Sequence, residues 1–191
     1  MRRLQLAIKL KTISATIFVA LAALISAPAI MADHNDLSYG NVFPDGFIEA
    51  TDGTQNTIRK MIAQSEYSVI VIWAVWCPFC SKELTRLDRS VANKDSGLQM
   101  IGLNLDDAKA PILRYKKKWR INQPLYFKAK KQLEHEKNSK NTLADILRVS
   151  NLPAIFIVNS QAEIVFFKEG WQPESKDSEY SNWILKISGK N

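Results

Sequence analysis

Cys77 and Cys80 are the residues of this sequence best suited to carry out chemistry, and they are its only two cysteines. A structural disulfide stabilises a protein mainly by closing a long loop of the unfolded chain, whereas a bond between residues three apart closes almost none. The pair therefore indicates thiol–disulfide exchange. In that reaction one thiolate attacks a disulfide sulfur, and a second thiolate resolves the mixed disulfide that forms.

The flanking segments predict which cysteine attacks. Residues 68–76 read SVIVIWAVW, a short β-branched and aromatic run typical of a strand buried on both faces. Residues 81–94 carry apolar side chains at helical spacing. Cys77 would then lie where a strand meets a helix, and the unpaired N–H groups and the dipole of that helix favour a thiolate. We expect Cys77 to be the nucleophile with a lowered pKa, and Cys80, one turn further along, to resolve the mixed disulfide.

The two residues between the cysteines have separate roles in this interpretation. Pro78 suits the first turn of a helix, because the N–H that it lacks would be unpaired there. Phe79 offers an apolar rim to a partner chain.

A CxxC pair is also half of a zinc site, which needs two further ligands. After the N-terminal segment the chain offers only His34 and His135. His34 lies near the start of that part, and His135 lies in a stretch rich in lysine and glutamate. We therefore predict no metal site and no cofactor.

The remaining segments alternate between helical and strand patterns. Helices are expected over residues 54–66, 81–94, 106–119, 130–149 with a break near 138–141, and 178–188. Strands are expected over residues 47–51, 68–76, 98–105, 123–127, 154–159 and 164–170, the last two as an antiparallel hairpin. This order predicts an α/β domain whose sheet is covered by helices on both faces.

The N-terminal residues 1–32 have the order of a secretory signal peptide: four basic residues, an apolar run over 12–25, and small residues before a cleavage site. We expect cleavage after Ala32, with Ala29 as the second choice. The alternative is an uncleaved membrane anchor, although the run is shorter than the roughly 20 apolar residues of a spanning helix. Residues 33–53 are expected to be an irregular lead-in, and residues 54–191 one domain without stable membrane insertion.

The net charge of +7 comes largely from the N-terminal segment, because the rest of the chain carries 22 basic and 19 acidic residues. This balance does not indicate a nucleic-acid partner. One basic segment, from Arg114 to Lys131, stands out. It is interpreted first as a solvated helix face, and alternatively as a docking surface for an acidic partner.

Two motifs resemble the thioredoxin superfamily: WAVWCPFC after a buried strand, and Asn151-Leu152-Pro153 before the strand AIFIVN. The signal segment and an insert over about residues 106–150 are more similar to the exported TlpA/ResA/DsbE-type proteins. The resemblance implies a thioredoxin fold, a central mixed sheet with helices on both faces and an insert before a cis-proline loop. It also implies that Pro153 is the cis-proline facing the disulfide, that Leu152 presents its backbone to substrate, and that Trp76 packs beside the site.

The sequence departs from thioredoxin at several positions. Val71 stands where thioredoxin has a buried aspartate, Gly102 and its neighbours offer no lysine on the next strand, and Thr85 replaces a helix-kinking proline. Some ResA-like proteins use a buried glutamate near the site. Glu83 is the candidate, but we expect an exposed helix acid there.

The functional hypothesis is a periplasmic thiol–disulfide oxidoreductase that reduces disulfides of partner proteins and draws electrons from a membrane thiol carrier. The lack of a long helical insertion like that of DsbA-type oxidants favours this direction. Two alternatives stay open: an oxidant or isomerase of secreted proteins, and a thioredoxin-fold binding module without redox turnover.

Overall fold

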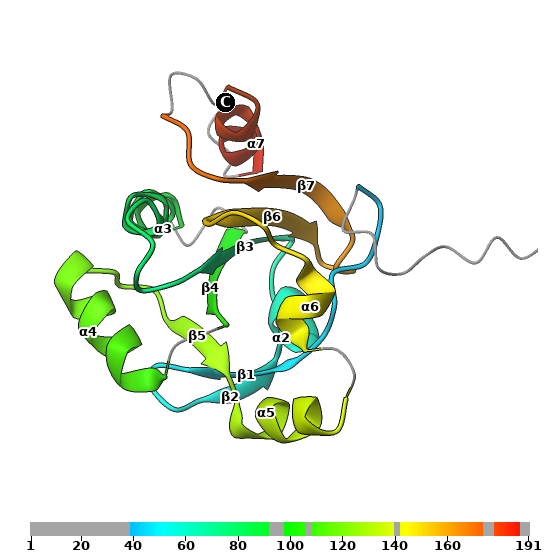
Figure 1. Cartoon of the computed structure of the whole chain (residues 1–191). Helices are drawn as coiled ribbons and strands as arrows, with labels where there is room; N and C mark the ends of the chain where they lie inside the picture. The colour runs from blue at the N-terminus through cyan, green and yellow to red at the C-terminus, as the bar shows by residue number, and fades with distance from the viewer. Residues whose placement is uncertain (1–38, 92–97, 106–107, 140–141, 174–177, 188–191) are drawn as a thin grey trace, which may run out of the picture. The chain divides into compact units, whose positions relative to one another are not determined.

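Seven strands form one mixed sheet in the computed structural model (Figure 1). The structure describes residues 39–91, 98–105, 108–139, 142–173 and 178–187, all within one unit that spans residues 34–191. The predicted signal peptide, residues 1–32, lies outside the described residues. The strands are β1 Phe47–Ala50, β2 Gln55–Thr57, β3 Tyr67–Trp73, β4 Leu98–Asn104, β5 Leu125–Lys128, β6 Ala154–Asn159 and β7 Ile164–Glu169.

The strand order is β2-β1-β5-β4-β3-β6-β7. β3 pairs in parallel with β4 and β4 with β5, while the remaining pairs are antiparallel. Every residue of β3 from Ser68 to Trp73 is buried, as its continuous apolar sequence predicts for a central strand. The predicted hairpin of β6 and β7 is confirmed.

Helices cover both faces of the sheet, as predicted. Val69, Val71 and Trp73 point into a core shared with α3 Cys80–Ser90, α4 Lys109–Trp119 and α7 Ser178–Ile187. Ile70 and Ile72 point into the opposite core, shared with α2 Ile58–Ile62 and α6 Leu143–Leu147. Successive residues of a strand face opposite sides, so β3 alone divides its side chains between the two cores.

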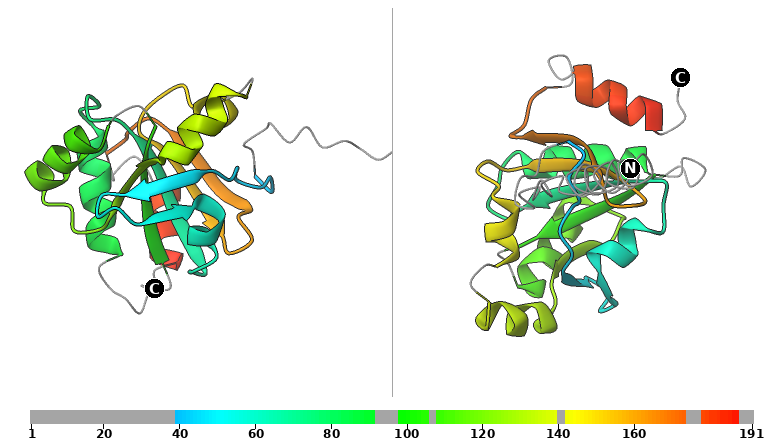
Figure 2. Two further views of the ribbon diagram at one scale, coloured as in Figure 1. Left: turned by 90° about the horizontal axis from the view of Figure 1, so that it is seen from below. Right: turned by 90° about the vertical axis from the view of Figure 1, so that its right-hand side faces the viewer.

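α7 lies along β7 in both Figure 1 and the right-hand view of Figure 2. There the Tyr180 ring stacks on Phe166 with centroids 5.6 Å apart. Among the described residues, none of the helices combines the length and apolar character that crossing a membrane requires.

The region around residue 54 differs from the prediction. Residues 55–57 form β2 rather than the first turn of a helix, and α2 begins only after Thr57, whose hydroxyl caps it by accepting the Lys60 N–H at 3.2 Å. The Asp52-Gly53 turn closes a hairpin of β1 and β2, with Gly53 at a φ of +98°. The strand predicted over residues 47–51 is confirmed as β1, so the end of the expected lead-in, residues 33–53, is a strand.

The insert between β4 and β6 contains α4, β5, α5 Lys130–Lys137 and α6. α5 ends at Lys137 and α6 begins at Leu143, on either side of the predicted break, of which residues 140–141 lie outside the described residues. A capping box of Thr142 and Asp145 starts α6. β5 lies between β4 and β1 in the sheet. Through β5, the insert thus joins the β1–β2 hairpin to the central strands, and the insert also contains α4.

Candidate active site

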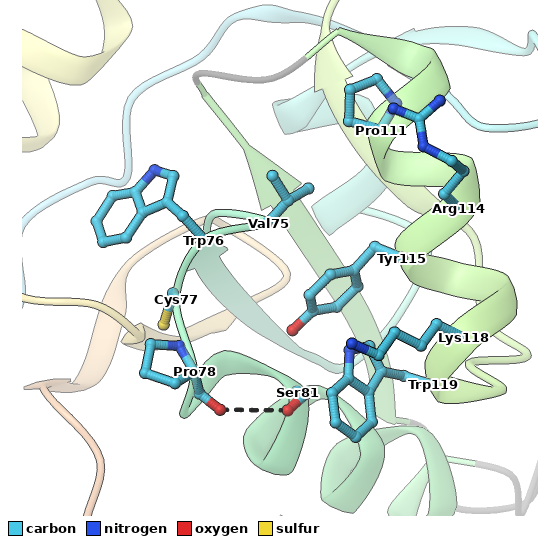
Figure 3. Close-up of a pocket in the computed structure, with 10 residues that line it drawn as sticks. All are labelled: Val75, Trp76, Cys77, Pro78, Ser81, Pro111, Arg114, Tyr115, Lys118 and Trp119. Atoms are coloured by element: carbon cyan, nitrogen blue, oxygen red, sulfur yellow. Dashed lines mark hydrogen bonds between the residues drawn. The ribbon is translucent and has the colours of Figure 1, made fainter.

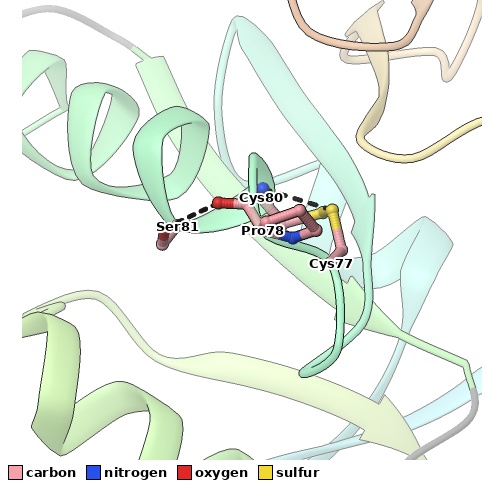
Figure 4. The surroundings of a disulfide bond; sticks show 4 residues. All are labelled: Cys77, Pro78, Cys80 and Ser81. Carbon is pink, nitrogen blue, oxygen red and sulfur yellow. Dashed lines mark hydrogen bonds between the residues drawn. A yellow bond between two sulfur atoms is a disulfide. The ribbon is translucent and has the colours of Figure 1, made fainter.

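Cys77 and Cys80 are joined by a disulfide, with their Cα atoms 5.4 Å apart (Figure 4). Cys77 lies in the loop that follows β3, and its N–H donates to the carbonyl of Ala74 at 3.2 Å. Cys80 is the first residue of α3, so the helix begins three residues after Cys77. The expected junction of a buried strand and a helix is therefore present, with Cys77 just before the helix.

The start of α3 directs a donor at Cys77. The Cys80 N–H donates to Cys77 Sγ at 3.2 Å. Phe79, the N-cap, provides no side-chain acceptor for the first turn, and the partial positive charge at a helix N-terminus acts on groups within that turn. The structure thus directs one N–H and a helix N-terminus at Cys77 Sγ, and both are groups that favour negative charge.

The residues flanking the cysteines form an exposed rim. Trp76 is 67% exposed and Phe79 44% exposed, whereas Cys77 is only 4% exposed and Cys80 is fully buried. Pro78 is also exposed. Of the two cysteines, only Cys77 has any exposed surface, and the order of attack stays a prediction.

Trp171, which sequence reasoning missed, extends this rim from the segment after β7. Its ring stacks on Phe79 with centroids 5.2 Å apart and planes 5° from parallel. Lys82 Nζ lies 4.6 Å from the centre of the Trp171 ring. No spacing in the sequence connects residues this far apart, so the structure was needed to bring them together.

The peptide bond between Leu152 and Pro153 is cis, as the resemblance implied. The register pairs Ala154 with Ile72 near the end of β3. The Leu152–Pro153 bond thus lies at the same end of the strands as the Cys77 loop. Pro153 is buried, while Leu152 is half-buried and packs against both cores.

A cavity of about 570 Å³ opens between the Cys77 loop and α4 (Figure 3). Its lining combines the loop with one face of α4 and consists of Val75, Trp76, Cys77, Pro78, Ser81, Pro111, Arg114, Tyr115, Lys118 and Trp119. A second cavity, of about 510 Å³, lies along α3 and shares Ser81 and Trp119 with the first. The sequence did not identify α4 as part of the site.

Tyr115 lies between α4 and the Cys77 loop, with its hydroxyl directed toward the loop (Figure 3). The hydroxyl is buried and makes no hydrogen bond of ordinary geometry within the described residues. Burial raises the pKa of Tyr115 to about 12, against a lowering effect of the Ser81 hydroxyl. The side chain therefore stays protonated across the physiological range.

Glu83 corrects a prediction, because it is buried and only 1% exposed. Its Oε1 accepts the Tyr180 hydroxyl at 2.8 Å and the Arg86 guanidinium at 2.7 Å. A carboxylate is buried at acceptable cost when it is paired and hydrogen-bonded. The signal in the sequence was its position: Glu83 lies three residues after Cys80 and four before Leu87, on the buried face of α3.

The structure shows the surroundings of the positions at which the sequence departs from thioredoxin. Val71 is fully buried and pairs with Gly102 on β4. Thr85 lies within α3, which is assigned as helix without interruption from Cys80 to Ser90. Within the parts of the chain that the structure describes, no three potential metal-ligating side chains cluster together; His34 lies outside those parts.

Comparison with known proteins places this chain in a family. The AhpC/TSA family model matches residues 39–167. The chain is 23% identical over 157 residues to the thiol–disulfide oxidoreductase ResA of Bacillus subtilis, covering 82% of this chain and 81% of ResA.

Solved structures show the same fold. One is the thioredoxin domain of a thiol–disulfide oxidoreductase from Bacteroides vulgatus, with a TM-score of 0.62 and 16% identity over 78% of this chain and 99% of that domain. Another is a secreted disulfide oxidoreductase of Mycobacterium tuberculosis homologous to Escherichia coli DsbE, with a TM-score of 0.55 and 15% identity over 81% of this chain and 99% of that one. The present chain belongs to the AhpC/TSA family, and it is a thiol–disulfide oxidoreductase with the thioredoxin fold.

Proposed function

We propose that this oxidoreductase is a periplasmic reductase that opens disulfides of partner proteins, with Cys77 attacking and Cys80 resolving. The observation that carries the proposal is the position of Cys77 Sγ, which accepts the Cys80 N–H at the start of α3 at 3.2 Å beside an exposed rim. A thiolate, rather than a thiol, is the nucleophile, and this position favours the thiolate.

The reaction begins with both cysteines reduced. The Cys77 thiolate attacks one sulfur of a partner disulfide, a new S–S bond forms, and the other partner sulfur leaves as a thiolate that takes up a proton. Cys80 then loses its proton and attacks Cys77 Sγ, which releases the second partner sulfur. The partner gains two electrons and two protons, and the enzyme ends with the Cys77–Cys80 disulfide that the structure contains.

The remaining site residues hold the partner in this proposal. The backbone of Leu152, next to the cis-Pro153 bond, pairs with an extended segment that carries the attacked cysteine. Trp76 and Phe79, both exposed, provide the apolar contact beside Cys77 together with Pro78.

A partner-trapping experiment tests the mechanism. Cys80→Ser blocks resolution, so it should accumulate mixed disulfides with its partners that a reductant releases. Cys77→Ser is the matched control and should trap little, because Cys80 is fully buried. Equal trapping by both variants would rule out the assigned order of attack. An intact cellular role in the Cys77→Ser strain would favour the binding module without redox turnover.

The direction of electron flow follows from the reduction potential of the pair, measured by equilibration with glutathione or dithiothreitol. A reductase should lie near thioredoxin, at about −270 mV, whereas a strong oxidant lies near −120 mV. A value near the oxidant would exclude the reductase and support the alternative of an oxidant or isomerase. A membrane thiol carrier would return electrons to the Cys77–Cys80 disulfide, and its removal should leave the protein oxidised in cells.

The periplasmic location rests on the signal pattern of residues 1–32. Cell fractionation followed by N-terminal sequencing should find a protein that begins after Ala32. A membrane-bound protein that retains its first residues would instead show the uncleaved anchor.

A further inference from the structure

The basic segment between Arg114 and Lys131 does not act as one surface. Lys116 donates to the carbonyls of Asn122 and Gln123 and so fastens the turn after α4. Lys128 pairs with Glu136 at 3.1 Å between β5 and α5. These cations are engaged in holding the insert together.

Arg114 and Lys118 are different. They lie one turn apart on α4, are exposed, and both line the cavity that contains Cys77 (Figure 3). The described part of the chain gives neither of them an ion pair with a carboxylate, although Lys118 Nζ lies 5.1 Å from the centre of the Trp119 ring. Two cations across the cavity from Cys77 thus remain available to an acidic group that enters it.

The charge is not offset by the rest of the lining. The cavity lining contains no aspartate or glutamate. The second cavity, which meets the first at Ser81 and Trp119, is lined by Lys82 and Arg89 and likewise by no carboxylate. The two cavities adjoin at Ser81 and Trp119, and we call the cationic surface that they line together, which also carries tryptophan and tyrosine rings, the cationic groove.

We infer that this cationic groove binds an acidic segment of the partner protein, so that disulfides flanked by aspartate or glutamate are preferred. The inference rests on the proposed function and specifies its substrate class. Unpaired cations at a cleft attract opposite charge over several ångströms and raise the rate of encounter, while the aromatic rings contact the apolar parts of an extended segment. A basic segment would meet repulsion at Arg114 and Lys118.

The test uses the full chain and two peptides with the same internal disulfide. The protein is first reduced with dithiothreitol, which is removed before the assay. One peptide carries two aspartates beside its cysteines, and the other carries two lysines. Acid-quenched samples separated by chromatography give the second-order rate constant for each peptide. We expect the acidic peptide to react about tenfold faster at low ionic strength, and the ratio to shrink toward one at about 1 M salt.

Two double variants with the same loss of charge separate the groove from net charge. R114Q/K118Q should reduce the ratio to about twofold or less, whereas K60Q/K117Q should keep it within about twofold of the wild-type ratio. Lys117 lies on α4 and Lys60 on α2, and neither lines the groove. Equal loss of preference in both variants, or no preference in the wild type, would overturn the inference.

A small neutral disulfide, 2-hydroxyethyl disulfide, distinguishes a failure of the docking inference from a failure of the proposed function. If the wild type reduces it but shows no preference between the peptides, the docking inference is wrong and the proposed function stands. If the wild type reduces none of the three disulfides, the proposed function fails and this inference fails with it.

Discussion

The buried hydrogen bond between Glu83 and Tyr180 predicts a large and specific loss of stability. Glu83→Ala leaves the fully buried Tyr180 side chain without its acceptor at 2.8 Å and removes the 2.7 Å ion pair of Arg86. An unsatisfied buried donor costs about 1–3 kcal/mol, and breaking a buried ion pair costs about 3–5 kcal/mol. Because the Arg86 side chain is 18% exposed and can regain water, we expect a total near 3–4 kcal/mol, against about 5–15 kcal/mol for a whole domain.

The Tyr180 hydroxyl stays a donor throughout the accessible pH range, because burial and the nearby Glu83 charge raise its pKa well above 10.0. Tyr180→Phe alone should therefore cost about 1–2 kcal/mol. In the double variant the two losses should overlap by a similar amount, since each single change removes the same bond.

Urea denaturation of the oxidised protein, followed by circular dichroism, measures these free energies of unfolding. Glu134→Ala is the matched control, because Glu134 also lies on a helix and its partner Lys130 is 3.9 Å away in an exposed pair; its cost should stay below about 1 kcal/mol. A Glu83→Ala protein within about 1 kcal/mol of the wild type, or strict additivity with Tyr180→Phe, would refute the reasoning.

Three further variants test other contacts. Asp88→Ala should cost about 2–4 kcal/mol in the same denaturation assay, because the Asp88 carboxylate accepts three hydrogen bonds, at 2.7–2.9 Å, from residues 122–123; a loss under about 1 kcal/mol would contradict this. Gly102→Ala should cost about 1–3 kcal/mol by overpacking, because a Cβ there would lie 2.6 Å from Leu125 Cδ2; an unchanged denaturation midpoint would show that Leu125 moves freely. Burial alone would raise the pKa of Glu136, but hydrogen bonds from α5, α6 and β5 lower it overall from 4.5. The stability that the ionised Glu136 contributes is then complete above its unfolded pKa and is lost as pH falls through its folded pKa. Glu136→Gln should therefore be less stable than the wild type at pH 7, and this difference in stability should disappear on acidification below about pH 5. A difference in stability that does not change with pH would show that the charge of Glu136 is not its source.

The central strands and the cysteine pair were predictable because their signals are local. A short and continuous β-branched run, as in β3, favours a strand covered on both faces, and the CxxC residues follow it directly. The motif before β6 identified the cis bond at Pro153 through the resemblance alone, since few X–Pro bonds are cis in general.

The strand β2 and the burial of Glu83 were mispredicted, because each depends on a contact outside its own segment. Residues 47–51 were predicted as a strand and supply β1, whereas residues 55–57, predicted as the first turn of a helix, form a strand by pairing with β1. Glu83 is buried because Tyr180 reaches it from α7, 97 residues away. An acid on an otherwise apolar helix face is the one local sign that such a partner exists.

The position of α4 shows how tertiary structure gives different roles to basic residues that lie close together in the sequence. β5 enters the sheet between β4 and β1, and Asp88 fixes the turn that follows α4 to α3. Those two constraints set the rotation of α4, which directs Ile112 and Tyr115 to the core and leaves Arg114 and Lys118 at the cavity beside Cys77. Lys116, two residues from each of them, points instead at the turn. Cations that are equivalent in sequence thus differ in role because a helix repeats every 3.6 residues: Arg114 and Lys118 line the cavity that contains Cys77, whereas Lys116 fastens the turn after α4.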